Sequence, residues 1–167
     1  MEDASFLFIL AEIAVGFAGF ASIVAVLGQR STRDHPRLDA FRLRGLLECS
    51  LLVVAFSLVP YAISRFSAGD LTVWRLSSGL FFVAGTAVTV ATFAHHRSIA
   101  HIPIPMGMRL VVLALYIVPL PALLLTAIGI FGDRSSPIYL LCLLSYLLAG
   151  GIGFFRVMVS FIAGVRE

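Results

Sequence analysis

The first apolar stretch of the chain, residues 6–28, reads FLFILAEIAVGFAGFASIVAVLG. It is long enough for a helix that crosses the hydrocarbon core of a bilayer, which needs about 20 apolar residues. One acid, Glu12, interrupts it. A carboxylate in hydrocarbon is costly, and ionisable residues within membrane spans usually mark function. This stretch therefore indicates a membrane protein and supplies its first candidate functional residue.

Four more apolar stretches follow, over residues 45–64, 76–94, 110–132 and 137–165. Hydrophobic residues make up 60% of the chain, charged residues 13%, and the mean hydropathy is +1.03. A soluble domain is about a quarter charged, so the composition indicates that the lipid bilayer surrounds this chain. Each stretch is about twice the length of a barrel strand and lacks strict alternation, which favours helix. We predict an all-α polytopic integral membrane protein, a bundle of five transmembrane helices in a single transmembrane domain spanning residues 1–167.

Prolines and arginines add detail to this bundle. Pro60, Pro119 and Pro121 lie inside apolar stretches and should bend the second and fourth helices. Glu2 and Asp3 replace the basic segment of a signal peptide, so we expect the first stretch to remain as a helix. The connections on one side hold eight arginines and those on the other side three (Arg65, Arg75 and Arg134). The positive-inside rule then predicts a cell inner or plasma membrane protein with its N-terminus outside and its C-terminus cytoplasmic.

The faces of the first helix differ in side-chain size. Small residues repeat every seven positions, which forms a smooth seam suited to close helix packing (Ala4, Ala11, Ala18 and Ala25; Ala14, Ala21 and Gly28). The opposite face carries large groups that suit lipid (Phe6, Ile13, Phe17, Phe20, Val24 and Leu27). Because the small seam is self-complementary, it predicts a homo-oligomer.

Glu12 lies beside this seam with Gly16 and Gly19 one and two turns further along. Two interpretations stay open. In the first, the carboxyl points into protein or a pore and meets an ion or proton. In the second, it forms a fixed hydrogen bond to a neighbouring helix and only specifies packing.

Other polar residues form two groups. Arg44 and Glu48 are four apart on one helix face, and Arg156 lies at a compatible depth on the last helix, so we predict a structural ion pair among the three. Thr89 and Thr92 belong to a polar stripe with Ser78, Gly85 and His96 on the third helix. A packing seam is the simpler interpretation of that stripe, and an ion or proton pathway through Thr89 and Thr92 is the other.

The sequence also argues against several classes of function. The chain has no lysine, which excludes Schiff-base chemistry. His35, His95, His96 and His101 gather on one side, but adjacent imidazoles point to different helix faces, so we predict no metal site. The basic residues act as topology signals, so no nucleic-acid partner is expected. With no phosphate loop and no hydrolase or metalloprotease motif, we expect neither an enzyme nor a cofactor.

The leading prediction is a small oligomeric membrane channel or transporter that conducts an ion or protons, with Glu12 as the ion-facing group. The alternative is a non-conducting membrane interaction or scaffold subunit of a larger complex with another protein. In that case the polar residues would only specify helix packing.

Overall fold

The computed structural model describes residues 4–28, 36–66, 69–97 and 106–164. Its helices are α1 (Ala4–Gly28), α2 (Pro36–Ser64), α3 (Asp70–Arg97), α4 (Met106–Ile117), α5 (Pro119–Ile128), the short 3-10 helix η1 (Gly132–Arg134) and α6 (Ser135–Gly164). Five segments are long and apolar enough to cross a membrane, and the fourth of them comprises α4 and α5. The prediction of an all-α, multi-pass membrane bundle is confirmed.

Two helices begin six or more residues earlier than the apolar stretches indicated. α2 starts at Pro36 rather than at residue 45, and α3 starts at Asp70 rather than at residue 76. Proline is favoured in the first turn of a helix because its missing N–H would have no partner there. An acid in the first turn is favoured by the helix dipole. Hydropathy finds only the part of a helix that suits lipid, so it misses these polar first turns.

The fourth span is broken, at the prolines that the sequence pointed to. α4 ends at Ile117, Val118 forms a turn, and α5 begins at Pro119. Pro119 and Pro121 have no N–H to donate to the carbonyls of Leu115 and Ile117, which removes two bonds of a continuous helix. α2, in contrast, stays helical through Pro60.

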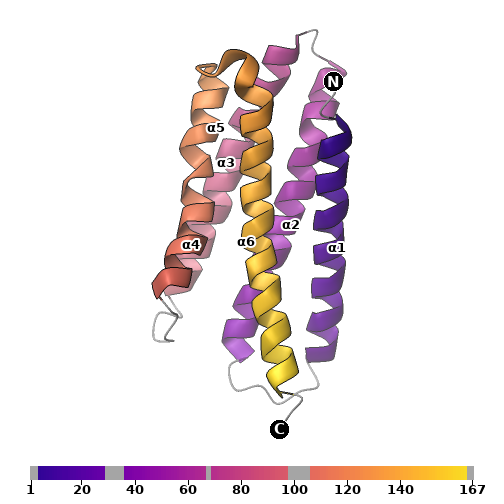
Figure 1. Cartoon of the computed structure of the whole chain (residues 1–167), viewed down its shortest axis with the longest axis vertical. Helices are drawn as coiled ribbons and strands as arrows, with labels where there is room; N and C mark the ends of the chain where they lie inside the picture. The colour runs from indigo at the N-terminus through magenta and orange to yellow at the C-terminus, as the bar shows by residue number, and fades with distance from the viewer. Residues whose placement is uncertain (1–3, 29–35, 67–68, 98–105, 165–167) are drawn as a thin grey trace.

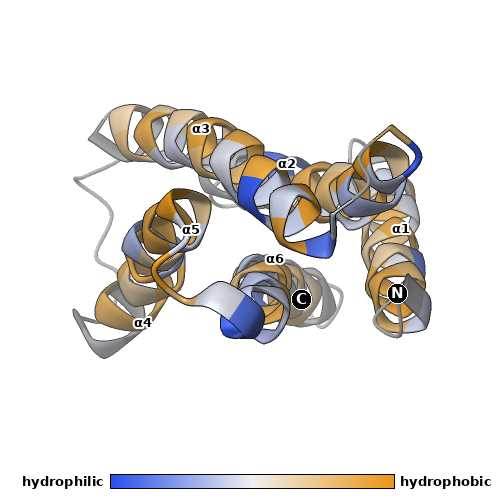
Figure 2. Cartoon of the chain, turned by 90° about the horizontal axis from the view of Figure 1, so that it is seen from above, coloured by the Kyte–Doolittle hydropathy of each residue, from blue (hydrophilic) through white to orange (hydrophobic). Residues whose placement is uncertain are grey.

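α6 is the central helix of the bundle. It contacts each of the other five α-helices, whereas α1 packs chiefly against α2, and α3 packs chiefly against α5. Seen from above, α1, α2 and α3 follow one another along one side, and α4, α5 and α6 lie beside them (Figure 2). α1 stands at the edge of the bundle, and the start of α1 and the end of α6 lie at opposite ends of it (Figure 1).

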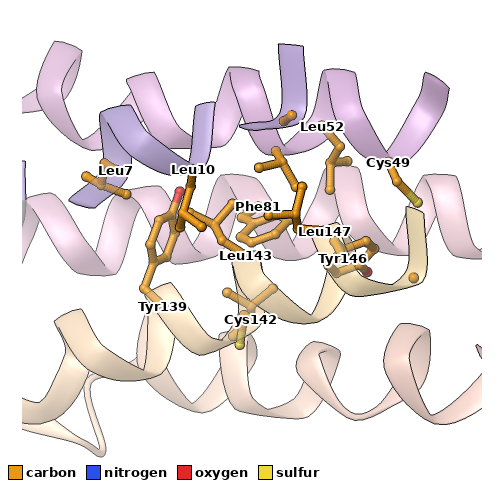
Figure 3. Close-up of a cluster of buried hydrophobic side chains, with 14 of the residues drawn as sticks. Leu7, Leu10, Cys49, Leu52, Phe81, Tyr139, Cys142, Leu143, Tyr146 and Leu147 are labelled. Carbon is orange, nitrogen blue, oxygen red and sulfur yellow. The ribbon is translucent and has the colours of Figure 1, made fainter. Parts of the chain in front are cut away.

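The core is aromatic in the half of the bundle towards the end where α1 begins. Phe56 of α2 and Phe81 of α3 stack with ring centroids 4.8 Å apart. Tyr139 of α6 packs edge-on against Phe81 at 5.6 Å and donates its hydroxyl to the Phe56 carbonyl at 2.6 Å. Leucines of α1, α2 and α6 close around these rings (Figure 3). The buried aromatic cluster therefore joins α2, α3 and α6 through packing and one hydrogen bond.

An arginine ties α3 to the end of α5. Gly129 follows α5 with φ 88°, and the N–H groups of Gly129 and Ile130 both reach the Leu125 carbonyl, which closes the helix in a Schellman arrangement. Arg75 Nη2 donates to the Ile128 carbonyl at 3.0 Å. Its guanidinium occupies the space that a Cβ on Gly129 would need. Glycine is thus required at 129 both by its backbone conformation and by the arginine above it.

Candidate functional site

Glu12 lies on the outer surface of the protomer. Its side chain is exposed, and among the described residues no hydrogen bond or ion pair reaches its carboxylate. Glu12 is eight residues below the first residue of α1, so it sits about 12 Å down the helix axis. That depth is within the span that begins at Ser5. A carboxyl group therefore faces outward from the protomer at a level where the surroundings are apolar.

The surface next to Glu12 is open. Gly16 and Gly19 are exposed, and a Cβ built on either residue would meet no atom within 4 Å. Both glycines follow Glu12 along one face of α1. The Glu12 carboxyl therefore does not point into the bundle of its own protomer, and its facing another protein or a pore stays a prediction.

The small seam of α1 is used inside the protomer instead. Ala11, Ala14 and Ala21 are buried in the bundle. The predicted lipid-facing side is also partly covered, because Phe17 and Phe20 both contact Phe154 of α6, with ring centroids at 5.6 and 5.4 Å. Alanines allow α1 to approach its neighbours closely, and this approach turns the Glu12 face away from them.

Thr89 belongs to a buried polar cluster in the other half of the bundle. Its Oγ1 donates to the Gly85 carbonyl at 2.7 Å and lies 3.4 Å from the Tyr146 hydroxyl. A Cβ on Gly85 would lie 2.8 Å from that hydroxyl, so the missing side chain makes room for Tyr146. The glycine and the threonine of α3 thus fit one tyrosine of α6.

The same cluster extends to α4 and α2. Tyr116 packs edge-on against Tyr146 at 5.6 Å, and its hydroxyl is 2.9 Å from Cys49 Sγ. Gly150 of α6 lets α2 approach, because its Cβ would lie 3.4 Å from that of Cys49. We define the residues Cys49, Thr89, Tyr116 and Tyr146 as the polar core cluster. Each of the four comes from a different helix, so the cluster fixes how α2, α3, α4 and α6 pack.

Several other hydroxyls in the spans have no hydrogen-bond partner among the described residues. They are Oγ of Ser50, Ser57, Ser77 and Ser78 and Oγ1 of Thr92. Thr92 is half-buried one turn beyond Thr89. α1 and α3 lie on opposite sides of α2, so Glu12 does not share a pathway with Thr89 and Thr92 inside one protomer (Figure 2).

The predicted ion pair is present for two of its three members. Arg44 Nε donates to Glu48 Oε1 at 2.6 Å on α2. The Arg44 side chain is 59% exposed and that of Glu48 28%, so water screens the pair and it adds little stability. Arg156 is half-buried on α6, and its contact with Glu48 stays a prediction.

His35 and His101 and the side chains of His95 and His96 lie outside the described residues. Within the described ranges no three metal-ligating side chains come together. No family model, no curated protein and no solved structure matches this chain.

The sequence placed Thr89 on a stripe of residues expected to pack against another helix. It did not identify the side chain that packs there, which is Tyr146. Tyr116 and Tyr146 each lie in an apolar stretch, where a buried tyrosine hydroxyl needs a hydrogen-bond partner. That requirement was a usable signal for the polar core cluster. The partners themselves come from other helices, so only the fold identifies them.

Proposed function

We propose that the protein is a small membrane channel or transporter built from several copies, and that it conducts protons or a cation. In this proposal Glu12 meets the conducted ion between copies rather than inside one copy. The observation that carries the proposal is the outward-facing carboxyl group of Glu12 at a depth within the span of α1. A carboxylate exposed to hydrocarbon is unfavourable, so a water-filled path or another protein must cover it.

The interior of the protomer supports this placement. The polar core cluster uses its hydroxyl and thiol groups on one another and on the Gly85 carbonyl. The other half of the core is filled by Phe56, Phe81 and Tyr139. Side chains engaged in this way hold helices together, so Thr89 is assigned to packing and Glu12 to conduction.

The proposal includes the orientation expected from the arginines, with the N-terminus outside and the C-terminus in the cytoplasm. Single cysteines at Ser31 and Ser67 test it with a membrane-impermeant thiol reagent. The residue 67 cysteine should be labelled in intact cells and the residue 31 cysteine only after permeabilisation. Labelling of both from one side would contradict the orientation.

Flux measurements in proteoliposomes test conduction directly. Wild type should carry protons or a monovalent cation, and Glu12→Gln should lower the flux at least about tenfold, since the amide keeps the size but cannot take up a proton. Glu48→Gln is the matched control, because it makes the same change at an acid paired with Arg44. Loss of flux in both variants, or in neither, would contradict the role of Glu12.

The second candidate is a non-conducting subunit that joins membrane proteins into a complex. It is favoured by the open glycines beside Glu12, because exposed glycines let another helix approach closely. Wild-type protein that carries no proton or cation but co-purifies with another membrane protein, and loses it when Gly16 is replaced by leucine, would support this candidate over conduction.

A further inference from the structure

The exposed face of α1 carries a repeat of alternating three- and four-residue steps. We define its seven members as the outer seam: Ser5, Ile9, Glu12, Gly16, Gly19, Ile23 and Val26. All seven are exposed in the protomer. Steps of three and four average 3.5 residues, which is the repeat of helices that wrap around each other in a left-handed coiled coil.

The face opposite the outer seam is the one that meets the bundle. Leu7, Ala14 and Ala21 also recur every seven residues, and each is no more than 1% exposed. In a seven-residue repeat, these positions lie across the helix from the seam. The outer seam therefore points directly away from the protomer, along the edge that α1 forms in Figure 1.

The composition of the outer seam suits a parallel helix pair. Gly16 and Gly19 allow two backbones to approach closely. Ile9, Gly16 and Ile23 are seven residues apart and form every second member of the seam. β-branched residues at one such set of positions favour two-stranded parallel coiled coils. Glu12 is the one charged residue of the seam, and a polar group within such a seam fixes the register of a helix pair.

We propose that a second copy of this chain packs along the outer seam as a parallel two-fold dimer, in which the two Glu12 carboxyl groups meet and share one proton. Copies inserted with the same orientation present α1 in the same direction, so identical positions face one another. Two adjacent carboxylates cannot both keep their charge at this depth, whereas an acid donating to a carboxylate makes a strong hydrogen bond. This inference rests on the proposed function only in placing Glu12 between copies.

The distribution of charged groups near the outer seam is consistent with two Glu12 carboxyl groups facing each other. Apart from Glu12, the seam residues are uncharged. α1 packs on α2 and α6, which lie on its other side. Tyr61 of α2 is an ionisable residue that contacts α1: its ring meets Phe8, one turn from Glu12 towards the N-terminus, with ring centroids 5.8 Å apart. Among the described residues, the group that faces Glu12 in the dimer is thus the partner's Glu12.

Cysteine cross-linking in native membranes tests the seam. Ile9→Cys and Ile23→Cys should each give disulfide-linked dimers on oxidation. Ile13→Cys is the matched control, because Ile13 is exposed on the same helix but lies off the seam. Wild type supplies the background, since Cys49 and Cys142 are buried. Cross-linking at residue 13 equal to that at residues 9 and 23, or at none of them, would overturn the proposal.

Mixing the two variants tests the direction of the pair. In a parallel dimer the residue 9 cysteine meets its own counterpart, so a co-expressed mixture should give no dimer that links residue 9 to residue 23. In an antiparallel pair centred on Gly16, residues 9 and 23 would meet, because each lies seven residues from that glycine. Dimers linking residue 9 to residue 23, with none in the separate variants, would overturn the parallel arrangement.

Replacing a glycine of the outer seam should weaken dimer formation while leaving the fold of the protomer intact. Gly16→Leu should reduce cross-linking at residue 9 at least about tenfold, because the added side chain fills the space between the helices. The protomer should still fold, because a Cβ at Gly16 meets no atom within 4 Å. Unchanged cross-linking in a folded Gly16→Leu protein would place the interface elsewhere.

The shared proton is tested by the pH dependence of dimerisation, followed by sedimentation in detergent micelles. Removing the proton leaves two facing carboxylates, so the wild-type dimer should weaken as pH rises, while the Glu12→Gln dimer should not change. A Glu12→Gln dimer with the same pH profile would overturn proton sharing. A wild-type dimer that cross-links as expected but carries no flux would refute conduction and leave the interface standing.

Discussion

Gly85 and Thr89 on α3 and Glu12 and Gly16 on α1 have the same spacing, a glycine and a polar residue one helical turn apart. On α3 the space above the glycine is filled by Tyr146, whose hydroxyl lies beside Thr89. On α1 the space above the glycine is empty and the acid has no partner among the described residues. The same spacing, in opposite order along the chain, therefore serves packing within the protomer on α3 and leaves an uncovered surface on α1.

This difference shows what decides the role of a glycine in a membrane helix. The backbone gains nothing from glycine in a helix interior, so its value comes from the neighbour that it admits. α3 is covered by α5, α2 and α6, whereas α1 is at the edge with one side unoccupied (Figures 1 and 2). Position in the bundle thus decides whether the neighbour is part of the same chain.

The largest expected difference is between Gly85→Leu and Gly16→Leu. At 85 a Cβ alone would lie 2.8 Å from the Tyr146 hydroxyl, so leucine overpacks the site and should lower the free energy of unfolding by about 3 kcal/mol. Leucine at 16 meets open space, so the change should stay within about 0.5 kcal/mol. Unfolding titrations of the monomer in mixed micelles measure both. Equal losses of unfolding free energy in the two variants would contradict the proposed difference between Gly85 and Gly16.

A double mutant sharpens the account of Gly85. Gly85→Ala should cost about 1–2 kcal/mol, because its Cβ would lie 2.8 Å from the Tyr146 hydroxyl. Tyr146→Phe removes that hydroxyl, so the double mutant should be more stable than the sum of the two single losses predicts. A thermodynamic cycle in the same micelles measures the coupling. Strict additivity would mean that the hydroxyl is not what fills the space above Gly85.

Removing a polar group should cost more stability in the polar core cluster than at the exposed face of α1. Tyr116→Phe deletes the buried contact with Cys49 Sγ and should cost about 1 kcal/mol of unfolding free energy. Glu12→Gln changes an exposed group, so the monomer should be affected by less than about 0.5 kcal/mol. Thermal unfolding of the two variants in detergent checks the order. A larger loss for Glu12→Gln would indicate an intramolecular partner for the acid.

The smallest effect is expected at the exposed ion pair. Arg44→Met removes the contact with Glu48 and should cost about 0.3–0.5 kcal/mol at low salt, and less as salt is added. Arg134→Met is a control, because Arg134 is also exposed and has no ion pair with another described residue. A loss of several kcal/mol at Arg44 would show that the pair is part of a larger network.

The number of spans, a distortion of the fourth span at its prolines and the Arg44–Glu48 pair followed from the sequence because each depends on neighbours along one chain segment. Apolar length gives a span, a missing N–H ends a helix, and residues four apart share a helix face. The small residues of α1 were also recognised as a packing seam. Their partner was predicted wrongly, because Ala14 and Ala21 meet their own bundle rather than a second copy.

The sequence also could not show whether the Glu12 side chain faces the bundle or its outside, because this too depends on which helices pack against α1. A helical pattern gives angles between side chains around the helix but not which angle faces the other helices. The ring contacts of Phe17 and Phe20 with Phe154 fix that rotation here, and they join residues more than 130 positions apart. The polar core cluster has the same origin, since its four members come from four helices.

The bond from Arg75 to the Ile128 carbonyl also has a consequence for biosynthesis. α3 leaves the ribosome before α5, so its arginine enters the membrane when the carbonyl that it will bind has not yet been made. Until then the guanidinium must be hydrated at the membrane surface, which holds the start of α3 at the lipid–water boundary. The arrival of Gly129, which leaves space for that guanidinium, allows the bond to form. The contact between α3 and the end of α5 can thus form only after α5 has been made.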